Sequence, residues 1–175
     1  RGRADHAVHA QALEALDRRR IERTEPHRHR QLQRLGVSTV VLGGPPRRLT
    51  YAEADRMVSA IAGRLRRMGL QTDQVVALQL PNSVEAILTL LGILRAGLIA
   101  APLPLLWRKA EAVAALSLVG AKTLIASGRL GDIDLSEQAM HVAADVFPIR
   151  YVCGFGRDLP DGVVSFDDLF GTDKP

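Results

Sequence analysis

The sequence contains little cysteine and little lysine. Cys153 is the only cysteine in 175 residues, and only three of the 23 basic residues are lysine. A single cysteine excludes a disulfide bond within the chain and suits a reducing compartment, so we expect a cytoplasmic protein. The preference for arginine over lysine, with much alanine and leucine, is typical of a bacterial protein encoded by a GC-rich genome.

Aromatic residues are also scarce, at 4% of the chain, and none occurs before Tyr51. The net charge is +4, and arginines crowd the N-terminal part at Arg18, Arg19, Arg20, Arg23, Arg28, Arg30 and Arg34. Proteins that bind single-stranded nucleic acid combine basic residues with rings on which bases stack. The missing rings argue against a nucleic-acid partner and favour a solvated amphipathic helix. Salt-dependent retention on DNA would test the alternative.

The chain lacks a hydrophobic run long enough to cross a membrane. Residues 78–103 are almost uncharged, but Glu85 and Arg95 interrupt them. The charge-free pieces, residues 86–94 and 96–107, are shorter than the roughly 20 apolar residues that a spanning helix needs. The segment is therefore interpreted as a buried strand, helix and strand.

The two ends also lack familiar features. The chain starts at Arg1 rather than Met, has no signal-peptide segment, and ends on Thr-Asp-Lys-Pro without a helix or strand signal. We therefore expect a piece of a longer protein. Helical periodicity over residues 5–35 is interrupted by Pro26. We divide the chain into a basic helical N-terminal segment, residues 1–36, and an α/β subdomain, residues 37–175.

A hairpin and a capped helix open the second part. Residues 37–42 and 47–49 predict two strands joined by a Gly-Gly-Pro-Pro turn. Thr50 and Glu53 form a capping box. Apolar residues then recur at spacings of three and four, which predicts one buried stripe on a helix that Gly69 ends.

Strands and helices alternate after this helix. Strands are predicted at residues 75–80, 98–101, 122–126 and 150–152, helices at 83–95, 109–119 and 136–147, and a short helical turn after Ser165. Asn82 and Glu85 predict the cap of the helix 83–95, which is apolar nearly all round and is expected to be buried on most sides. The alternation predicts an α/β fold with a mainly parallel sheet flanked by helices.

The order of these features resembles the N-terminal region of AMP-forming acyl-CoA synthetases, in the adenylate-forming superfamily. The resemblance rests on LTYAEADRMVSAIAGRLRRMGLQTDQVVALQLPNS, EAILTLLGILRAGLIAAPLPLLWR and AALSLVGAKTLIAS, within residues 49–127. The family has here a Leu-Thr/Ser-Tyr start, a helix ending before glycine, a strand ending in Pro-Asn, a helix closing with Lys/Arg-Ala-Gly, and a strand ending in proline.

This resemblance implies an enzyme, an AMP-forming acid–thiol ligase, as the parent of the chain. Such enzymes activate a carboxylic acid, here taken to be a fatty acid, with ATP and Mg²⁺. An acyl-adenylate forms, pyrophosphate leaves, and CoA or a carrier thiol accepts the acyl group. The implied fold is the N-terminal subdomain of the adenylate-forming fold.

The sequence departs from the family at the phosphate-binding loop. In the family this loop is rich in Ser, Thr and Gly and ends in Pro-Lys, because backbone amides and a lysine surround phosphate oxygens. Here Lys174-Pro175 has the reverse order and no such run before it. The family's adenine-binding, ribose-binding and lid residues would lie beyond Pro175. No catalytic, cofactor-binding or metal-binding residue is therefore assigned, and the chain alone is expected to be inactive and to bind no cofactor.

Several polar features suggest sites but have plainer explanations. His27 and His29 do not share a helix face, which disfavours a metal pair. The Gly-Phe-Gly of residues 154–156 lacks the third glycine of a dinucleotide fingerprint, so a turn is preferred. The Gly-Gly-Pro-Pro turn of residues 43–46 is too short to hold a phosphate.

The other candidates are a cysteine, an acidic cluster and a tryptophan. A nucleophilic Cys153 needs a base, and only His141 lies near it in sequence, so a buried structural cysteine is predicted. Trp107 beside Arg108 is interpreted as a surface or interface anchor. Acidic residues are favoured at a helix start, and that explains the cluster Asp132, Asp134 and Glu137.

Two functions from different classes remain. The first is the N-terminal part of a fatty acid–CoA ligase, with the rest of the parent chain as its partner. The second is a stand-alone, non-catalytic binding or interaction module of the same fold. A stop codon after Pro175 would favour the module, and a phosphate-binding loop there would favour the enzyme. We also expect an unprotected sheet edge to pair with a second copy and give a homodimer.

Overall fold

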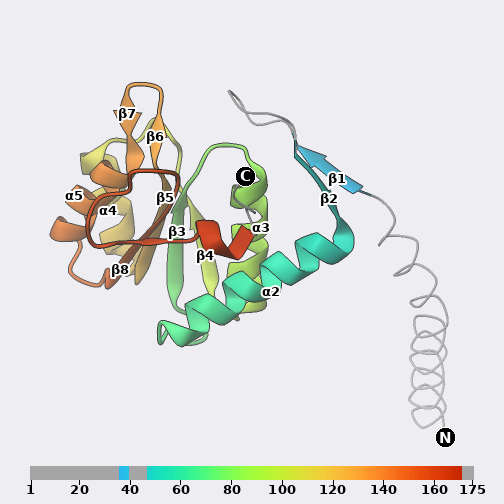
Figure 1. Ribbon diagram of the computed structural model, residues 1–175. Coiled ribbons are helices and arrows are strands. Elements are labelled where there is room, and N and C mark those ends of the chain that lie inside the picture. The colour runs from blue at the N-terminus through green and yellow to red at the C-terminus, as the bar shows by residue number, and fades with distance from the viewer. Residues whose placement is uncertain (1–35, 40–46, 171–175) are drawn as a thin grey trace, which may run out of the picture.

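The computed structural model describes residues 36–39 and 47–170, where a five-stranded parallel sheet lies between two layers of helices (Figure 1). The strand order is β4-β3-β5-β8-β9. The strands are β3 Val75–Gln79, β4 Ile99–Pro102, β5 Thr123–Ser127, β8 Tyr151–Phe155 and β9 Val163–Ser165. The predicted α/β fold with a mainly parallel sheet is confirmed. The predicted helix over residues 5–35, the pair His27 and His29, the turn at 43–46 and residues 171–175 lie outside the described residues.

Helices cover both faces of this sheet. One face carries α2 (Tyr51–Arg67) and α3 (Val84–Arg95), and the other carries α4 (Lys109–Val119) and α5 (Leu135–Asp145). Two antiparallel hairpins, β1 (Gly36–Thr39) with β2 (Arg47–Thr50) and β6 (Arg129–Leu130) with β7 (Ile133–Asp134), and the short 3₁₀ helix η1 (Asp167–Phe170) complete the described fold. In this described part no helix is long and apolar enough to cross a membrane.

Alternation along each strand divides the core in two. Leu78 of β3 packs toward α2 and α3, whereas its neighbour Ala77 packs toward α4 and α5. In β5, Ile125 likewise packs toward α2 and α3, and Leu124 packs toward α4 and α5. Because successive side chains point to opposite faces, a strand buried on both faces is apolar throughout. The short uninterrupted apolar runs of the sequence therefore became the central strands of the sheet.

The capping box at the start of α2 is confirmed. The Thr50 amide donates to the Glu53 carboxylate at 2.7 Å, and the Glu53 amide donates to the Thr50 hydroxyl at 3.3 Å. The predicted stripe is buried at Val58, Ile61, Ala62 and Leu65. Gly69 follows the helix with φ of +83°, a left-handed conformation that favours glycine.

Two predictions about α3 are wrong. The N-cap is Ser83 rather than Asn82, because the extended Ser83 places its hydroxyl 3.2 Å from the Ala86 amide. The helix is also not buried on most sides. Ile87, Leu91 and Leu94 are 46%, 45% and 56% exposed, since α2 and the sheet occupy only the opposite side of α3. α3 therefore carries more apolar side chains than the described fold buries.

Arginine side chains fix α3 against α2. The Arg95 guanidinium donates to the Asp55 carbonyl at 3.0 Å, to the Ser59 hydroxyl at 2.8 Å and to the Asp55 carboxylate at 2.7 Å. Arg66 in turn donates to the Arg95 carbonyl at 2.7 Å. Arg95 of the Arg-Ala-Gly sequence that ends α3 thus has a structural role in holding the two helices together.

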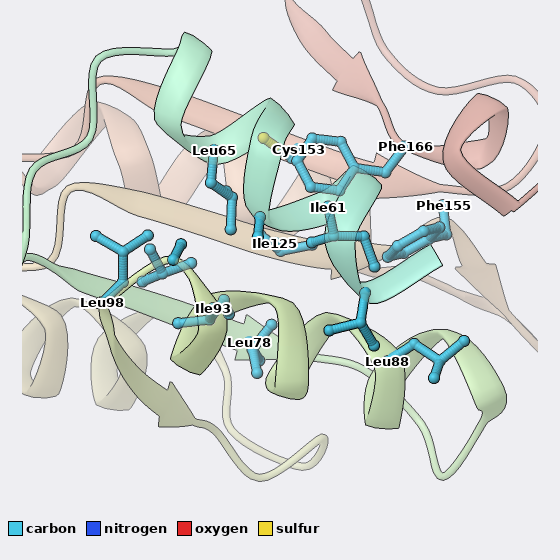
Figure 2. Close-up of a cluster of buried hydrophobic side chains, with 14 of the residues drawn as sticks. Ile61, Leu65, Leu78, Leu88, Ile93, Leu98, Ile125, Cys153, Phe155 and Phe166 are labelled. Carbon is cyan, nitrogen blue, oxygen red and sulfur yellow. The ribbon is translucent and has the colours of Figure 1, made fainter. Parts of the chain in front are cut away.

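The C-terminal part contains more strand than the sequence predicted. β8 extends to Phe155, and β9 adds a fifth strand in parallel register with β8, pairing Val152 with Val163. The chain then crosses to α2, where Asp168 of η1 forms an ion pair with Arg64. Phe166 completes the core beneath α2, beside Phe155 and Cys153 (Figure 2). Phe170 belongs to the same buried cluster.

Candidate functional site

The carboxyl ends of β3 and β5 mark the point where the chain connections diverge. From β3 the chain passes through α3 to β4 on one side, and from β5 it passes through α5 to β8 on the other. In open parallel α/β sheets, ligands bind in the crevice outside this point. A ligand site is therefore expected at this edge of the sheet.

Backbone of residues 103–108 lies at this point, held there by two glutamines. The amide of Gln79, the last residue of β3, donates to the Pro104 carbonyl at 3.2 Å and to the Trp107 carbonyl at 3.1 Å. Gln138 of α5 donates to the same Trp107 carbonyl at 2.9 Å. Trp107, predicted as a surface or interface anchor, is half-buried. The carbonyl oxygen of the Gln79 side chain is buried and has no partner among the described residues.

An apolar pocket of about 340 Å³ opens beside this loop, between α3 and the ends of β3 and β4. Its polar lining residues are Asn82 and the α3 cap, Ser83. The volume falls at the lower end of small-molecule pockets. The apolar lining residues are Leu78, Leu80, Ala86, Ile87, Leu90, Pro102 and Leu103. The lining suits an aliphatic or aromatic group and contains no titratable side chain with which to catalyse a reaction.

A second, polar hollow of about 370 Å³ lies between the starts of α4 and α5. Both acidic and basic side chains line it, including Arg108, Lys109, Glu137 and His141. Lys109 is paired with Asp145 at 2.8 Å. No group of three or more His, Cys, Asp or Glu that could hold a metal ion occurs in the described ranges.

The acidic cluster beside this hollow is a helix start, as predicted. The Asp134 carboxylate caps α5 by accepting from the Ser136 hydroxyl at 2.6 Å and from the Glu137 amide at 3.0 Å. These two hydrogen bonds hold the pKa of the Asp134 carboxyl below its usual value of 3.8, and the bond from the Ser136 hydroxyl has the larger effect. Capping therefore explains Asp134, and Glu137 lies in the first turn of α5, where acidic residues are favoured.

This cap gives a pH prediction. Because the pKa of Asp134 is lower in the folded state, its contribution to stability is present above pH 3.8 and is lost as the pH falls through the folded value. In Asp134→Asn, which keeps a capping side chain but does not titrate, we expect a smaller loss of stability on acidification. Urea midpoints at neutral pH and at about pH 3 measure this. Ser136→Ala should shift the profile in the same direction, and an unchanged profile in Asp134→Asn would contradict the assignment.

Cys153 is a structural residue, as predicted. Its side chain is buried in β8 beneath α2, and burial raises the pKa of the thiol to about 12. A thiol with that pKa is not ionised at neutral pH, and the thiolate is the nucleophile. His141, the histidine near it in sequence, is an exposed residue of α5.

The glycines at the ends of β5 and β8 do not form a phosphate cradle. The Gly128 amide donates to the Phe155 carbonyl at 2.6 Å, and the Gly156 amide donates to the Asp167 carboxylate at 3.1 Å. A phosphate-binding loop needs backbone amides that are free to point at the ligand. Gly154 and Phe155 belong to β8, so the turn predicted for residues 154–156 begins only at Gly156, and the amides of Gly128 and Gly156 are not available to a phosphate.

Comparison with known proteins identifies the class to which this fold belongs. A family model described as AMP-binding enzyme matches residues 28–152. The chain belongs to this family, within the adenylate-forming superfamily. Its fold is also similar to acetoacetyl-CoA synthetase from Streptomyces lividans, with a TM-score of 0.65 at 22% identity, over 75% of this chain and 21% of that one.

Curated relatives include synthetases named for cyclosporin and gramicidin S. Cyclosporin synthetase simA of Tolypocladium inflatum is 35% identical over 111 residues, which are 62% of this chain and 1% of that protein. Gramicidin S synthase 2 of Brevibacillus brevis is 32% identical over 89 residues, 51% of this chain and 2% of that protein. The chain thus spans a small part of the length of the proteins that it matches.

Sequence reasoning missed the residues that shape this edge. Gln79 stands alone as a polar residue in the run Leu78–Gln79–Leu80, which is a signal that its side chain has a buried partner. The partners, however, are main-chain carbonyls about 25 residues further on. The apolar pocket had no local signal, because three separate segments of the chain line it.

Proposed function

We propose that the chain is the first subdomain of an enzyme that activates a carboxylic acid as its adenylate with ATP and passes the acyl group to a thiol. The match to the AMP-binding enzyme family, which runs through most of the described sheet, carries this proposal. The described residues supply the scaffold. ATP, Mg²⁺ and a thiol such as CoA would be bound by other parts of the enzyme, since the Gly128 and Gly156 amides are engaged within the chain and the described residues contain no group of three or more His, Cys, Asp or Glu that could hold a metal ion.

The acid substrate has two candidates, each supported by a different comparison. The fatty acid predicted from the sequence is consistent with the fold shared with an acyl-CoA ligase. The curated relatives, with identities of 35% and 32%, are peptide synthetases, which favours an amino acid passed to a carrier thiol. The sequence similarity to the peptide synthetases exceeds that to the ligase, and we therefore place the amino acid first.

A pyrophosphate exchange assay tests the proposal. The complete reading frame that contains these residues is incubated with ATP, labelled pyrophosphate and single acids from a panel of fatty acids and amino acids. We expect exchange with one class of acid. Exchange with fatty acids alone would reverse our order of substrates, and no exchange with any acid would favour a stand-alone module.

The 175-residue chain alone is expected to show no exchange above background, because its described residues lack a phosphate cradle. The assay is the same, and the complete reading frame is the control. Exchange by the isolated chain would overturn this expectation.

We further propose a cytoplasmic location, which a buried cysteine without a second cysteine supports. Cell fractionation tests it, and recovery in a secreted fraction would contradict it.

A further inference from the structure

The side of α3 that faces away from the core is an apolar surface. Ile87, Leu91 and Leu94 form this α3 stripe, and each is about half exposed. On the opposite side of the same helix, Leu88 and Ile93 are buried against α2 and the sheet. A helix that borders water is expected to carry polar residues on its outer side. The α3 stripe therefore has the composition of a surface that another element covers.

The apolar pocket continues the α3 stripe toward the ends of the strands. Ile87 belongs to both, and Leu80, Pro102 and Leu103 line the far side of the pocket. The result is a contiguous apolar surface with a hollow of about 340 Å³ at one end. Contiguous exposed apolar surface of this kind marks a site of association. A hollow in such a surface can accept an apolar side chain of whatever covers it.

The sheet edge beside α3 is poorly suited to association. In β4, the amides of Ile99 and of the following Leu103 donate inward, toward β3, at 3.0 and 2.7 Å. The backbone groups of the alternate residues, Ala100 and Pro102, therefore face the open edge. Pro102 has no N–H, so within β4 only Ala100 has an outward amide. Pairing of this edge with a second copy, which the sequence led us to expect, would gain few backbone hydrogen bonds.

The length of the proteins that share this fold indicates what covers the α3 stripe. The chain covers only 21–25% of three solved chains with the same fold, so most of each of those polypeptides lies outside the shared part. A segment linked covalently to α3 is present at an effective concentration in the millimolar range. A second copy must instead associate from dilute solution. A linked segment is therefore favoured over a second copy as the cover.

We propose that the remainder of a longer parent polypeptide packs its own apolar surface on the α3 stripe and places an apolar side chain in the adjoining pocket. The inference rests on the proposed function, in which this chain is the first subdomain of a larger enzyme. No charged residue of α3 stands between Glu85 in its first turn and Arg95 in its last, so the contact along the helix is apolar. This arrangement accounts for the apolar side chains of α3 that the described fold leaves exposed.

Thiol reactivity compares this surface in the two proteins. Leu91→Cys is introduced into the 175-residue chain and into the complete reading frame, and modification of the peptide that contains residue 91 is followed by mass spectrometry. We expect modification to be at least about tenfold slower in the complete protein, since a covered thiol reacts only when its cover opens. Leu118→Cys, an exposed position of α4 on the other face of the sheet, is the matched control and should react at similar rates in both proteins.

A charged substitution gives a second, independent readout. In the 175-residue chain, Leu91→Glu is expected to keep the folded yield and the urea midpoint of the wild type, because residue 91 is about half exposed there. In the complete protein the same carboxylate would be buried without a partner, so the folded yield is expected to fall several-fold. Leu118→Glu is the control and should leave the yield of both proteins unchanged. An equal effect of Leu91→Glu in the two proteins would contradict the proposal.

Other results separate the possible covers for α3. Equal thiol reactivity at residue 91 in the two proteins would overturn the proposal. Protection of that thiol in the 175-residue chain, with a dimer in light scattering, would overturn it in favour of a second copy, and so would a stop codon after Pro175 in favour of a stand-alone module.

Pyrophosphate exchange by the complete protein distinguishes this inference from the proposed function. Exchange together with a fully reactive thiol at residue 91 would remove the inference and leave the function in place. Protection of residue 91 without exchange would leave the contact in place and remove the function.

Discussion

Replacing Phe166 by alanine is expected to lower the free energy of unfolding by about 3–5 kcal/mol, as for other buried aromatic side chains. Phe166 is fully buried, and its ring lies 6.0 Å from that of Phe155 at an interplanar angle of 87°. Phe170 meets the same Phe155 ring at 5.2 Å. Edge-to-face pairs of this kind add stability beyond the area that they bury.

The Phe166 variant tests whether the C-terminal segment belongs to the same cooperative unit as α2. Phe166 links the end of β9 to the core beneath α2 (Figure 2), where Arg64 also pairs with Asp168. Equilibrium unfolding in urea measures the change. The matched control is Phe147→Ala, since Phe147 is 99% exposed and its removal should change stability by less than about 0.5 kcal/mol. Equal effects of the two substitutions would contradict the arrangement.

Replacing Gly92 by valine is expected to cost about 3 kcal/mol, because the added side chain overpacks the contact between α2 and α3. A Cβ atom at Gly92 would lie 2.5 Å from the Ile61 Cγ2 atom, 2.8 Å from its Cβ atom and 3.3 Å from the Val58 carbonyl oxygen. Ile61 is fully buried and cannot move aside without disturbing the core. The helices would have to separate.

A second helical glycine provides the control for this substitution. A Cβ atom at Gly63 of α2 would meet only the end of the Arg67 side chain, at 3.2 Å, and that side chain is free to move. Gly63→Ala is therefore expected to raise the free energy of unfolding by about 0.5–1 kcal/mol through helix propensity. Thermal and urea unfolding of both variants measure the difference. A stabilised Gly92→Val would show that the helices do not pack as closely as the structure indicates.

Much of the fold was readable from the sequence, because its signals are local. The capping box needs only Thr50 and Glu53, three residues apart, and both of its hydrogen bonds form. The apolar stripe of α2 follows from helical periodicity. The alternation of strands and helices in turn favours parallel pairing. Residues that stop a helix by a left-handed conformation, Gly69 and Gly120, also need no tertiary contact to be recognised.

Other features depended on which segments meet in space. The N-cap of α3 is Ser83 rather than the predicted Asn82, because the extended backbone at Ser83 directs its hydroxyl to the first turn of the helix. Gln79 finds its partners in the loop at residues 103–108. Strand β9 forms because β8 offers it a parallel register.

The sequence by itself determined the family and the layered α/β architecture, since both follow from the order of short-range patterns along the chain. It also indicated that Cys153 and the acidic cluster at Asp134 have structural roles. Only the tertiary structure decided which side of α3 is buried. Hydrophobicity predicts burial of a residue only if another element covers it, and in the described fold α2 and the sheet cover one side of α3 while Ile87, Leu91 and Leu94 stay exposed.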